Sequence, residues 1–276
     1  MTKPSYIKII ATCLWLLAPQ LFAKTVYTFG VVPQFEARAL LEIWAPIFKA
    51  LETNTGFEIK FVGSPTIAEF EQNLASGAFD FAYMNPYHLI IANQQKGYVP
   101  IVRDGERKLF GVLAVAKGGP IKSISDLQNK KIAFPSPNAL GASLMMRAIL
   151  TEKEKIKFSP QYSQTHTSSY LNVLLGQASA AGGVMSTFKK QSSDIQNKLE
   201  IIYRTPKVAP HPIATLPKVP EHHRKLIMDA FFKISKTKDG LKNLEKIPLT
   251  HPMEAKLKDY TELKQMNLER YYETPK

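Results

Sequence analysis

The sequence predicts an α/β fold of two lobes, each a mixed and mostly parallel sheet flanked by helices, with two crossing hinge strands between them. Short apolar runs alternate with amphipathic segments along most of the chain, which is typical of α/β proteins. A helix that ends at a glycine before a strand is expected at residues 74–82, and a similar pattern returns about a hundred residues later at 175–181. This repetition favours two similar lobes whose loops face a shared cleft.

The first lobe is expected to begin with alternating strands and helices. We expect strands at residues 25–32, 57–62 and 79–84 and helices at 37–53 and 66–76, the longer helix having its apolar residues at helical spacing. Successive strand and helix units imply that these strands run parallel.

Several residues are assigned to turns and caps rather than to a ligand. Gly77 and Gly176 each follow a helical segment, where a left-handed glycine commonly ends the helix. Asn129 stands in a turn and tolerates a positive φ. Ser64 and Thr66 precede a helix and are expected to cap it.

Two crossings are expected to connect the lobes. The first is the apolar run 109–116, and the second is the strand at 199–203 with the segment after it. The glycines and prolines that follow each suit a hinge and a plain loop equally well. C-terminal helices, including one at 221–235, should pack on lobe 1. The expected domains are residues 24–118 plus 205–276 for lobe 1 and residues 119–204 for lobe 2.

The first 23 residues have the pattern of a secretory signal peptide. Lys3 and Lys8 precede an apolar stretch at residues 9–18, which is too short to span a bilayer comfortably. Cleavage is expected after Ala23, with an uncleaved anchor as the alternative. A cleavable signal predicts a periplasmic protein.

Cysteine content and charge limit the chemistry. Cys13 is the single cysteine and lies in the signal segment, so disulfides, thiolate metal sites and cysteine nucleophiles are excluded from the mature chain. Removal of residues 1–23 lowers the formal charge from +13 to +11. Solvated helix faces account for most lysines, and the positive field favours an anionic ligand or membrane surface over nucleic acid, for which no binding motif is present.

A group of hydroxyls and one imidazole at residues 165–169 precedes an apolar helical run. A helix start presents unbonded N–H groups, which hold anions. The histidines match no metal spacing, and neither a nucleophile elbow nor a phosphate-binding loop is present. We therefore expect capture of a small oxyanion, with no metal, no cofactor and no catalysis.

Four groups of residues resemble the phosphate/phosphite/phosphonate-binding family of periplasmic solute-binding proteins. They are residues 77–82 with Tyr87, residues 126–134, residues 137–143, and His166 with Gly176. The resemblance implies the two-lobed type II periplasmic binding protein fold, a monomer that binds a small anionic ligand, and an inner-membrane ABC permease as its partner. A sensor subunit that presents a sulfonate or carboxylate to a signalling receptor, and a phosphoester hydrolase, are the alternatives.

The resemblance also implies ligand contacts in lobe 1. Tyr87 matches an aromatic ligand position of the family, although a tyrosine that only covers the cleft wall fits the same pattern. Asn85 is either a ligand contact or the cap of a helix that begins at Pro86. Gln34 and Phe35 lie in the matching loop after the first strand, where they supply an amide donor and an apolar wall.

In lobe 2 the chain departs from the family pattern. Where the family typically has Ser-Thr-Ser-Gly, this chain has Ala-Leu-Gly-Ala at residues 139–142, so hydroxyl donors are missing. Backbone N–H groups survive there, and space beside Ala139 and Leu140 suits a larger or less charged substituent. The remaining candidate contacts are Asn138, Ser143, His166, Ser168 and Ser169.

Overall fold

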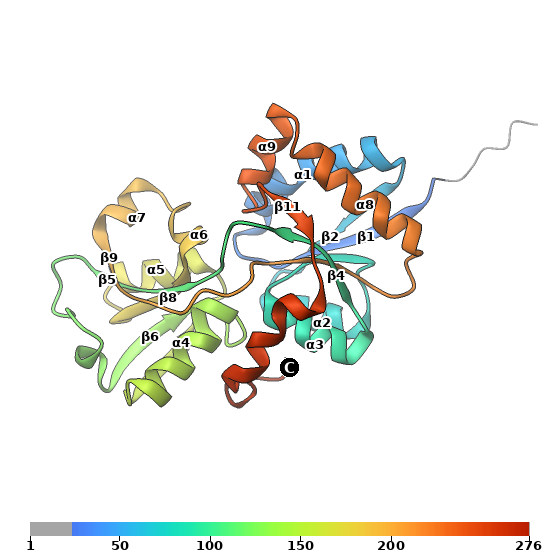
Figure 1. Cartoon of the computed structure of the whole chain (residues 1–276). Coiled ribbons are helices and arrows are strands. Elements are labelled where there is room, and N and C mark those ends of the chain that lie inside the picture. Colours follow the sequence, from blue (N-terminus) through green and yellow to red (C-terminus); the bar gives the residue numbers. More distant parts are fainter. Residues whose placement is uncertain (1–23, 276) are drawn as a thin grey trace, which may run out of the picture.

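The computed structural model describes residues 24–275, and the expected signal peptide lies outside the described residues. The chain forms two α/β lobes side by side, connected by two crossings (Figure 1). This confirms the predicted fold class. Within the described range, no helix has the length and apolarity needed to cross a membrane.

Lobe 1 is built on a six-stranded mixed sheet in the order β11-β4-β10-β3-β1-β2. Strand β1 pairs in parallel with β2 and β3, as the strand and helix alternation predicts, whereas β10 runs antiparallel between β3 and β4. Its elements are β1 (Val26–Val31), α1 (Ala37–Thr55), β2 (Glu58–Val62), α2 (Ile67–Ser76), β3 (Phe81–Tyr83), α3 (Pro86–Lys96), β4 (Val99–Asp104), β10 (Ile213–Thr215), α8 (Glu221–Ile234), α9 (Lys238–Glu245) and β11 (Pro252–Glu254).

Lobe 2 is built on a five-stranded sheet in the order β7-β6-β8-β5-β9. Strand β6 is parallel to β7 and β8, and β5 is antiparallel to β8 and β9. Its elements are β5 (Gly111–Ala116), η1 (Ser125–Leu127), β6 (Lys130–Phe134), η2 (Leu140–Leu144), α4 (Met145–Ala148), η3 (Ile149–Lys153), β7 (Phe158–Tyr162), α5 (His166–Leu174), β8 (Ala180–Val184), α6 (Met185–Phe188), α7 (Ser193–Lys198) and β9 (Leu199–Arg204).

The two crossings run next to each other between the lobes. Leu109 and Val208 exchange backbone hydrogen bonds of 3.0 and 2.9 Å, so the crossings form a short antiparallel pair. The boundary expected at residue 118 places β5 in lobe 1, whereas β5 pairs with β8 and β9 in the second sheet. Apolar alternation identifies a strand but not its partners, and these partners come later in the chain.

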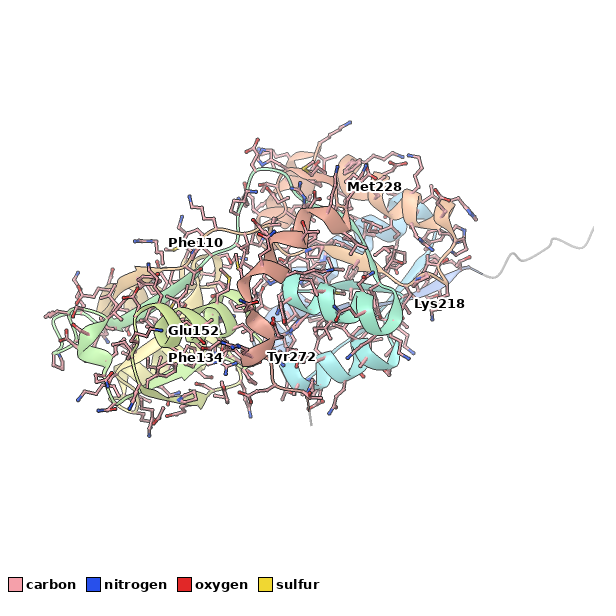
Figure 2. All side chains as sticks on the ribbon, turned by 60° about the horizontal axis from the view of Figure 1, so that its bottom comes forward. Phe110, Phe134, Glu152, Lys218, Met228 and Tyr272 are labelled. Atoms are coloured by element: carbon pink, nitrogen blue, oxygen red, sulfur yellow. The ribbon has the colours of Figure 1, made fainter. Side chains whose placement is uncertain are left out.

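The C-terminal segment returns from lobe 1 to lobe 2. After β11 it forms η4 (Leu257–Met266) and η5 (Leu268–Tyr271), which descend beside α3 and reach α4 (Figure 1). Tyr272 lies at the junction of the lobes (Figure 2). Helices α8 and α9 pack against α1, which agrees with the expected position of the C-terminal helices on lobe 1.

Local features agree with the sequence. Gly77 and Gly176 have φ of 77° and 69°, and Asn129 has a φ of 58°. The Thr66 side chain caps α2 by accepting from the Glu69 amide, while Ser64 accepts from the Asn73 side chain. The cap expected at Thr66 is confirmed, whereas Ser64 holds a side chain inside α2 instead of capping the helix.

Apolar packing continues from one lobe into the other. The lobe 1 core, which contains the fully buried Phe29 and Trp44, also includes Ala139 and Val184 of lobe 2. A second buried cluster joins residues of α3, η2, α4, both crossings and the C-terminal segment. The lobes are therefore in direct contact, and opening them exposes apolar surface to water.

Candidate ligand-binding site

A small cavity, here called the inner cavity, lies between the lobes where several helices begin. Its volume is about 20 Å³, which is room for about one water molecule. Helices α2, α3, η2 and α5 begin at or next to it, and helix starts carry N–H groups without intrahelical partners. The lining residues are Val32, Gln34, Ile67, Asn85, Leu109, Ala139, Leu140, Gly141, His166, Val184 and His211.

Lobe 1 contributes two amides and an imidazole to the inner cavity. Gln34 Nε2 lies 3.4 Å from His211 Nε2. Asn85 caps α3, because its Oδ1 accepts from the amides of Tyr87 and His88 at 2.8 Å each, and its Nδ2 donates across the cleft to the Asn138 carbonyl at 3.2 Å. Asn85 is therefore both the expected helix cap and a cavity residue.

Lobe 2 contributes a backbone turn and His166. Leu140 and Gly141 open the π-helical turn η2 at the cavity wall. His166 is the first residue of α5 and is 3% exposed, and its Nδ1 has no hydrogen-bond partner among the described residues. A buried polar atom without a partner costs free energy, so its presence in a cavity indicates a place for a ligand.

Both cavity histidines are neutral at pH 7. Burial lowers the pKa of His166 to about 4, and burial with the nearby His88 and His166 lowers the pKa of His211 to about 3. The His211 ring also stacks on Tyr83, with ring centroids 5.2 Å apart. Since no lysine or arginine is among the residues that line the cavity, the site offers neutral N–H donors.

Five of the eleven sequence-predicted site residues line the inner cavity: Gln34, Asn85, Ala139, Leu140 and His166. The other six lie outside it. Tyr87 points into the buried cluster with η2 and the C-terminal segment, with its ring 5.8 Å from that of Tyr272. Phe35 lies beneath the Lys190 ammonium, which is 5.8 Å from its ring centre.

The remaining predicted residues make structural hydrogen bonds in lobe 2. Asn138 binds the backbone of Glu273. Ser143 accepts from Arg147 Nε at 3.1 Å. Ser168 and Ser169 bond to Thr165, the residue that caps α5. Helical spacing turns Ser168, two positions after His166, away from the cleft. Ser169, three positions after His166, is on the same side of the helix but is fully buried, and its hydroxyl donates to the Thr165 carbonyl at 3.1 Å.

Sequence reasoning missed His211. It lies on the second crossing, at a distance in the chain from every other cavity residue, and it lacks the helix-start signal that marks His166. The second crossing was itself expected from the sequence. The position of a histidine on a segment between the lobes could therefore have identified His211 as a candidate cavity residue.

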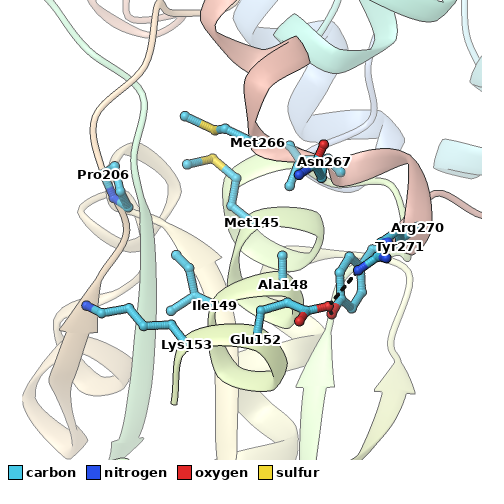
Figure 3. A pocket seen from close by; sticks show the side chains of 11 residues that line it. Met145, Ala148, Ile149, Glu152, Lys153, Pro206, Met266, Asn267, Arg270 and Tyr271 are labelled. Carbon is cyan, nitrogen blue, oxygen red and sulfur yellow. Dashed lines mark hydrogen bonds and ion pairs between the residues drawn. The ribbon is translucent and has the colours of Figure 1, made fainter. Parts of the chain in front are cut away.

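A larger cavity of about 390 Å³ lies between α4, η3 and the C-terminal segment (Figure 3). Its walls are mainly apolar, with Met145, Ile149 and Met266 among them. At its rim Tyr271 donates to Glu152 at 2.9 Å, so this pair is already satisfied. It lacks the converging free donors of the inner cavity and is the weaker candidate for an anion.

The match to a known protein family agrees with a ligand-binding site between the lobes. Residues 29–260 match the family model described as the periplasmic substrate-binding protein of phosphonate ABC transporters. The chain belongs to this family. Its members are substrate-binding components of transporters rather than enzymes, which confirms the predicted resemblance and the binding role.

Individual relatives and structures agree with the family assignment. The phosphonates-binding periplasmic protein of Escherichia coli K12 is 23% identical over 233 residues, covering 79% of this chain and 69% of that protein. The structure of a phosphonate transporter binding protein from Pseudomonas aeruginosa matches with a TM-score of 0.82 at 16% identity, covering 90% and 88% of the two chains. PhnD1 of Prochlorococcus marinus with methylphosphonate matches with a TM-score of 0.81 at 16% identity, covering 89% and 98%. These structural matches show the shared fold.

Proposed function

We propose that this family member binds a small phosphonate-like oxyanion in the inner cavity and delivers it to an inner-membrane ABC permease. The observation that carries the proposal is the unpaired Nδ1 of buried His166, in a cavity surrounded by helix starts of both lobes. The relatives named for phosphonates support the ligand class.

Neutral donors are sufficient for such a ligand. A micromolar site requires about 8 kcal/mol, and each hydrogen bond to a charged group contributes about 1.5–3 kcal/mol. The side chains of Gln34, Asn85 and His166, with the amides at the start of η2, supply the required four or five donors. A site without a buried cation also binds other anions weakly, which favours selectivity.

The inner cavity must widen to admit this ligand. A phosphonate group has a phosphorus atom and three oxygens, whereas about 20 Å³ holds about one water. Separation of the lobes about the crossings supplies the space, and a ligand that contacts both lobes then stabilises the closed form. We infer that the permease recognises this closed form.

Thermal unfolding with a ligand panel tests the proposal. The panel contains phosphate, phosphite, methylphosphonate, aminoethylphosphonate, sulfate and small sulfonates. A ligand at a hundred times its dissociation constant should add about 2.7 kcal/mol of stability. A stabilising response to the phosphorus oxyanions supports the proposal, and a flat response across the panel contradicts it.

Two matched variants test the contacts. His166→Ala removes a cavity donor and should weaken binding by at least tenfold, which corresponds to about 1.4 kcal/mol. Tyr87→Phe changes a side chain outside the inner cavity and should leave affinity within about twofold. Equal affinities of the wild type and His166→Ala would remove His166 from the site.

The proposal also covers the removal of the signal peptide and the oligomeric state of the protein. We expect protein recovered from the periplasm to begin at Lys24 and to be a monomer. Intact mass measurement of the N-terminus and light scattering during gel filtration check the two expectations. A mass that includes residues 1–23 would indicate an uncleaved anchor instead.

A further inference from the structure

A second cavity between the lobes, here called the basic cavity, adjoins the inner cavity. Its volume is about 340 Å³, and His211 is one of three residues that line both. Arg107 and Lys108 of the first crossing and Lys189 of lobe 2 line it. Phe110, another lining residue, lies at the lobe junction on the side away from Tyr272 (Figure 2).

The cations of the basic cavity have no acidic partners. Within residues 24–275, no carboxylate oxygen lies within 4.0 Å of the charged groups of Arg107, Lys108 or Lys189. The nearby carboxylate of Asp104 is occupied, because it accepts from the backbone amides of Glu106, Arg107 and His251 at 2.7–2.9 Å. The three cations therefore have no ion-pair partner within residues 24–275, and their donors are free to contact an anionic ligand.

The rim of the basic cavity adds more positive charge. Lys190 donates to the carbonyl of Lys246 across the cleft, and the Lys207 ammonium lies 5.9 Å from the ring centre of Phe110. Desolvation, followed by the charges of Arg107 and Lys246, lowers the pKa of Lys190 to about 8. Burial accounts for the largest part of this shift, and the neighbouring positive charges add to it.

A further cavity, which shares Ile67 with the inner cavity, contains two carboxylates that have internal partners. It measures about 700 Å³, and Glu71 and Glu273 are among its lining residues. Glu71 lies 2.8 Å from His88 Nε2, and Glu273 lies 3.3 Å from the Arg147 guanidinium. A cationic substituent would have to compete with these internal partners, whereas an anionic group in the basic cavity meets free cations.

We propose that the ligand is a phosphonate whose substituent carries a second anionic group. The phosphonate group occupies the inner cavity, and the second anion lies in the basic cavity near Arg107, Lys108 and Lys189. The inference rests on the proposed function, since it requires a phosphonate group at His166. The two cavities share three lining residues, so we expect a short carbon linker to connect the two anionic groups.

Isothermal titration calorimetry on the mature protein tests the inference with four ligands: 3-phosphonopropionate, propylphosphonate, methylphosphonate and 2-aminoethylphosphonate. The first two have similar size and differ in the carboxylate. We expect 3-phosphonopropionate to bind at least tenfold more tightly than propylphosphonate, since its carboxylate gains charged hydrogen bonds. This difference should shrink as salt concentration rises.

A double variant, Arg107→Gln with Lys189→Gln, should remove this preference and leave methylphosphonate affinity within about threefold. The matched control, Lys130→Gln with Lys131→Gln, removes the same charge from exposed residues at the far end of β6 and should retain the preference. Equal binding of 3-phosphonopropionate and propylphosphonate would overturn the inference, as would tighter binding of 2-aminoethylphosphonate. If methylphosphonate and the other ligands all fail to bind, the proposed function falls as well.

Discussion

His166 is one of two buried histidines that make the stability of the protein depend on pH. Its folded pKa is about 4, below the value of 6.5 for a free histidine, so the folded protein resists protonating it. The unfolded chain binds this proton as the pH falls below 6.5, and folding stability is therefore present above that pH and lost below it. Each pKa unit corresponds to about 1.4 kcal/mol.

We predict that ligand-free protein loses about 2 kcal/mol of stability through His166 between pH 7 and pH 5. Urea unfolding at both pH values gives the total loss. His166→Gln, which cannot titrate, should lose about 2 kcal/mol less than the wild type over the same interval. Equal losses in the two proteins would show that His166 is solvated rather than buried.

A site residue can be predicted from the sequence when the pattern that places it lies in its own stretch of the chain. Thr165 as the cap and His166 as the first helical residue follow from one stretch of sequence, and α5 begins there. Gln34 and Asn85 follow loops after strands and also reach the inner cavity. Tyr87 and Ser169 carried the same kind of signal but face packed neighbours, because the direction of a side chain depends on contacts distant in the sequence.

The elements that meet at the cleft depend on close backbone contacts. Strand β5 and the η2 turn touch at Gly111 and Gly141, and a Cβ added to Gly111 would lie 1.9 Å from the Gly141 carbonyl oxygen. The Gly111 amide also donates to Thr205 Oγ1 at 2.7 Å, which connects the two crossings. The contact explains the glycine in the Ala-Leu-Gly-Ala segment, since a Cβ on Gly141 would lie 3.0 Å from the Gly111 nitrogen.

We predict that Gly111→Ala destabilises the protein by about 1–3 kcal/mol, the usual cost of forcing extra volume into a packed site. Urea unfolding of the purified variant measures it. Gly63→Ala is the matched control, since its Cβ would meet only the Phe61 ring at 3.7 Å, and it should stay within about 0.5 kcal/mol of the wild type. Equal stability of the two variants would contradict the prediction, because it would show that η2 can shift away from β5 to accommodate the added Cβ at little cost.

Elements with a strong apolar period were predictable, and their assignment to sheets was not. The segments expected at 25–32, 37–53 and 57–62 correspond closely to β1, α1 and β2. The run at 109–116 was expected to cross between the lobes, yet β5 occupies residues 111–116 inside the second sheet. The η4 and η5 turns gave no clear periodic signal, because irregular helical turns are held by tertiary contacts rather than by their own pattern.

At the scale of the whole molecule, the C-terminal segment fastens lobe 1 to lobe 2. The Glu273 backbone exchanges hydrogen bonds of 2.7 and 3.0 Å with the Asn138 side chain. Its carboxylate accepts from Tyr162 at 2.7 Å and lies 3.3 Å from Arg147. These contacts stabilise the closed arrangement of the lobes, in addition to the apolar cluster beneath them.

We predict that a chain ending at Tyr272 spends more time open when ligand-free. A net contribution of about 1.4 kcal/mol from the lost hydrogen bonds lowers the closed fraction, and the apparent dissociation constant rises by the same factor, about tenfold. Small-angle scattering should show a larger radius of gyration without ligand and the wild-type value at saturation. A chain ending at Thr274 retains Glu273 and should behave as the wild type does. The chain ending at Tyr272 could instead match the wild type in radius of gyration and in apparent dissociation constant. That result would show that the apolar cluster alone holds the lobes together and that the contacts of Glu273 do not stabilise the closed form.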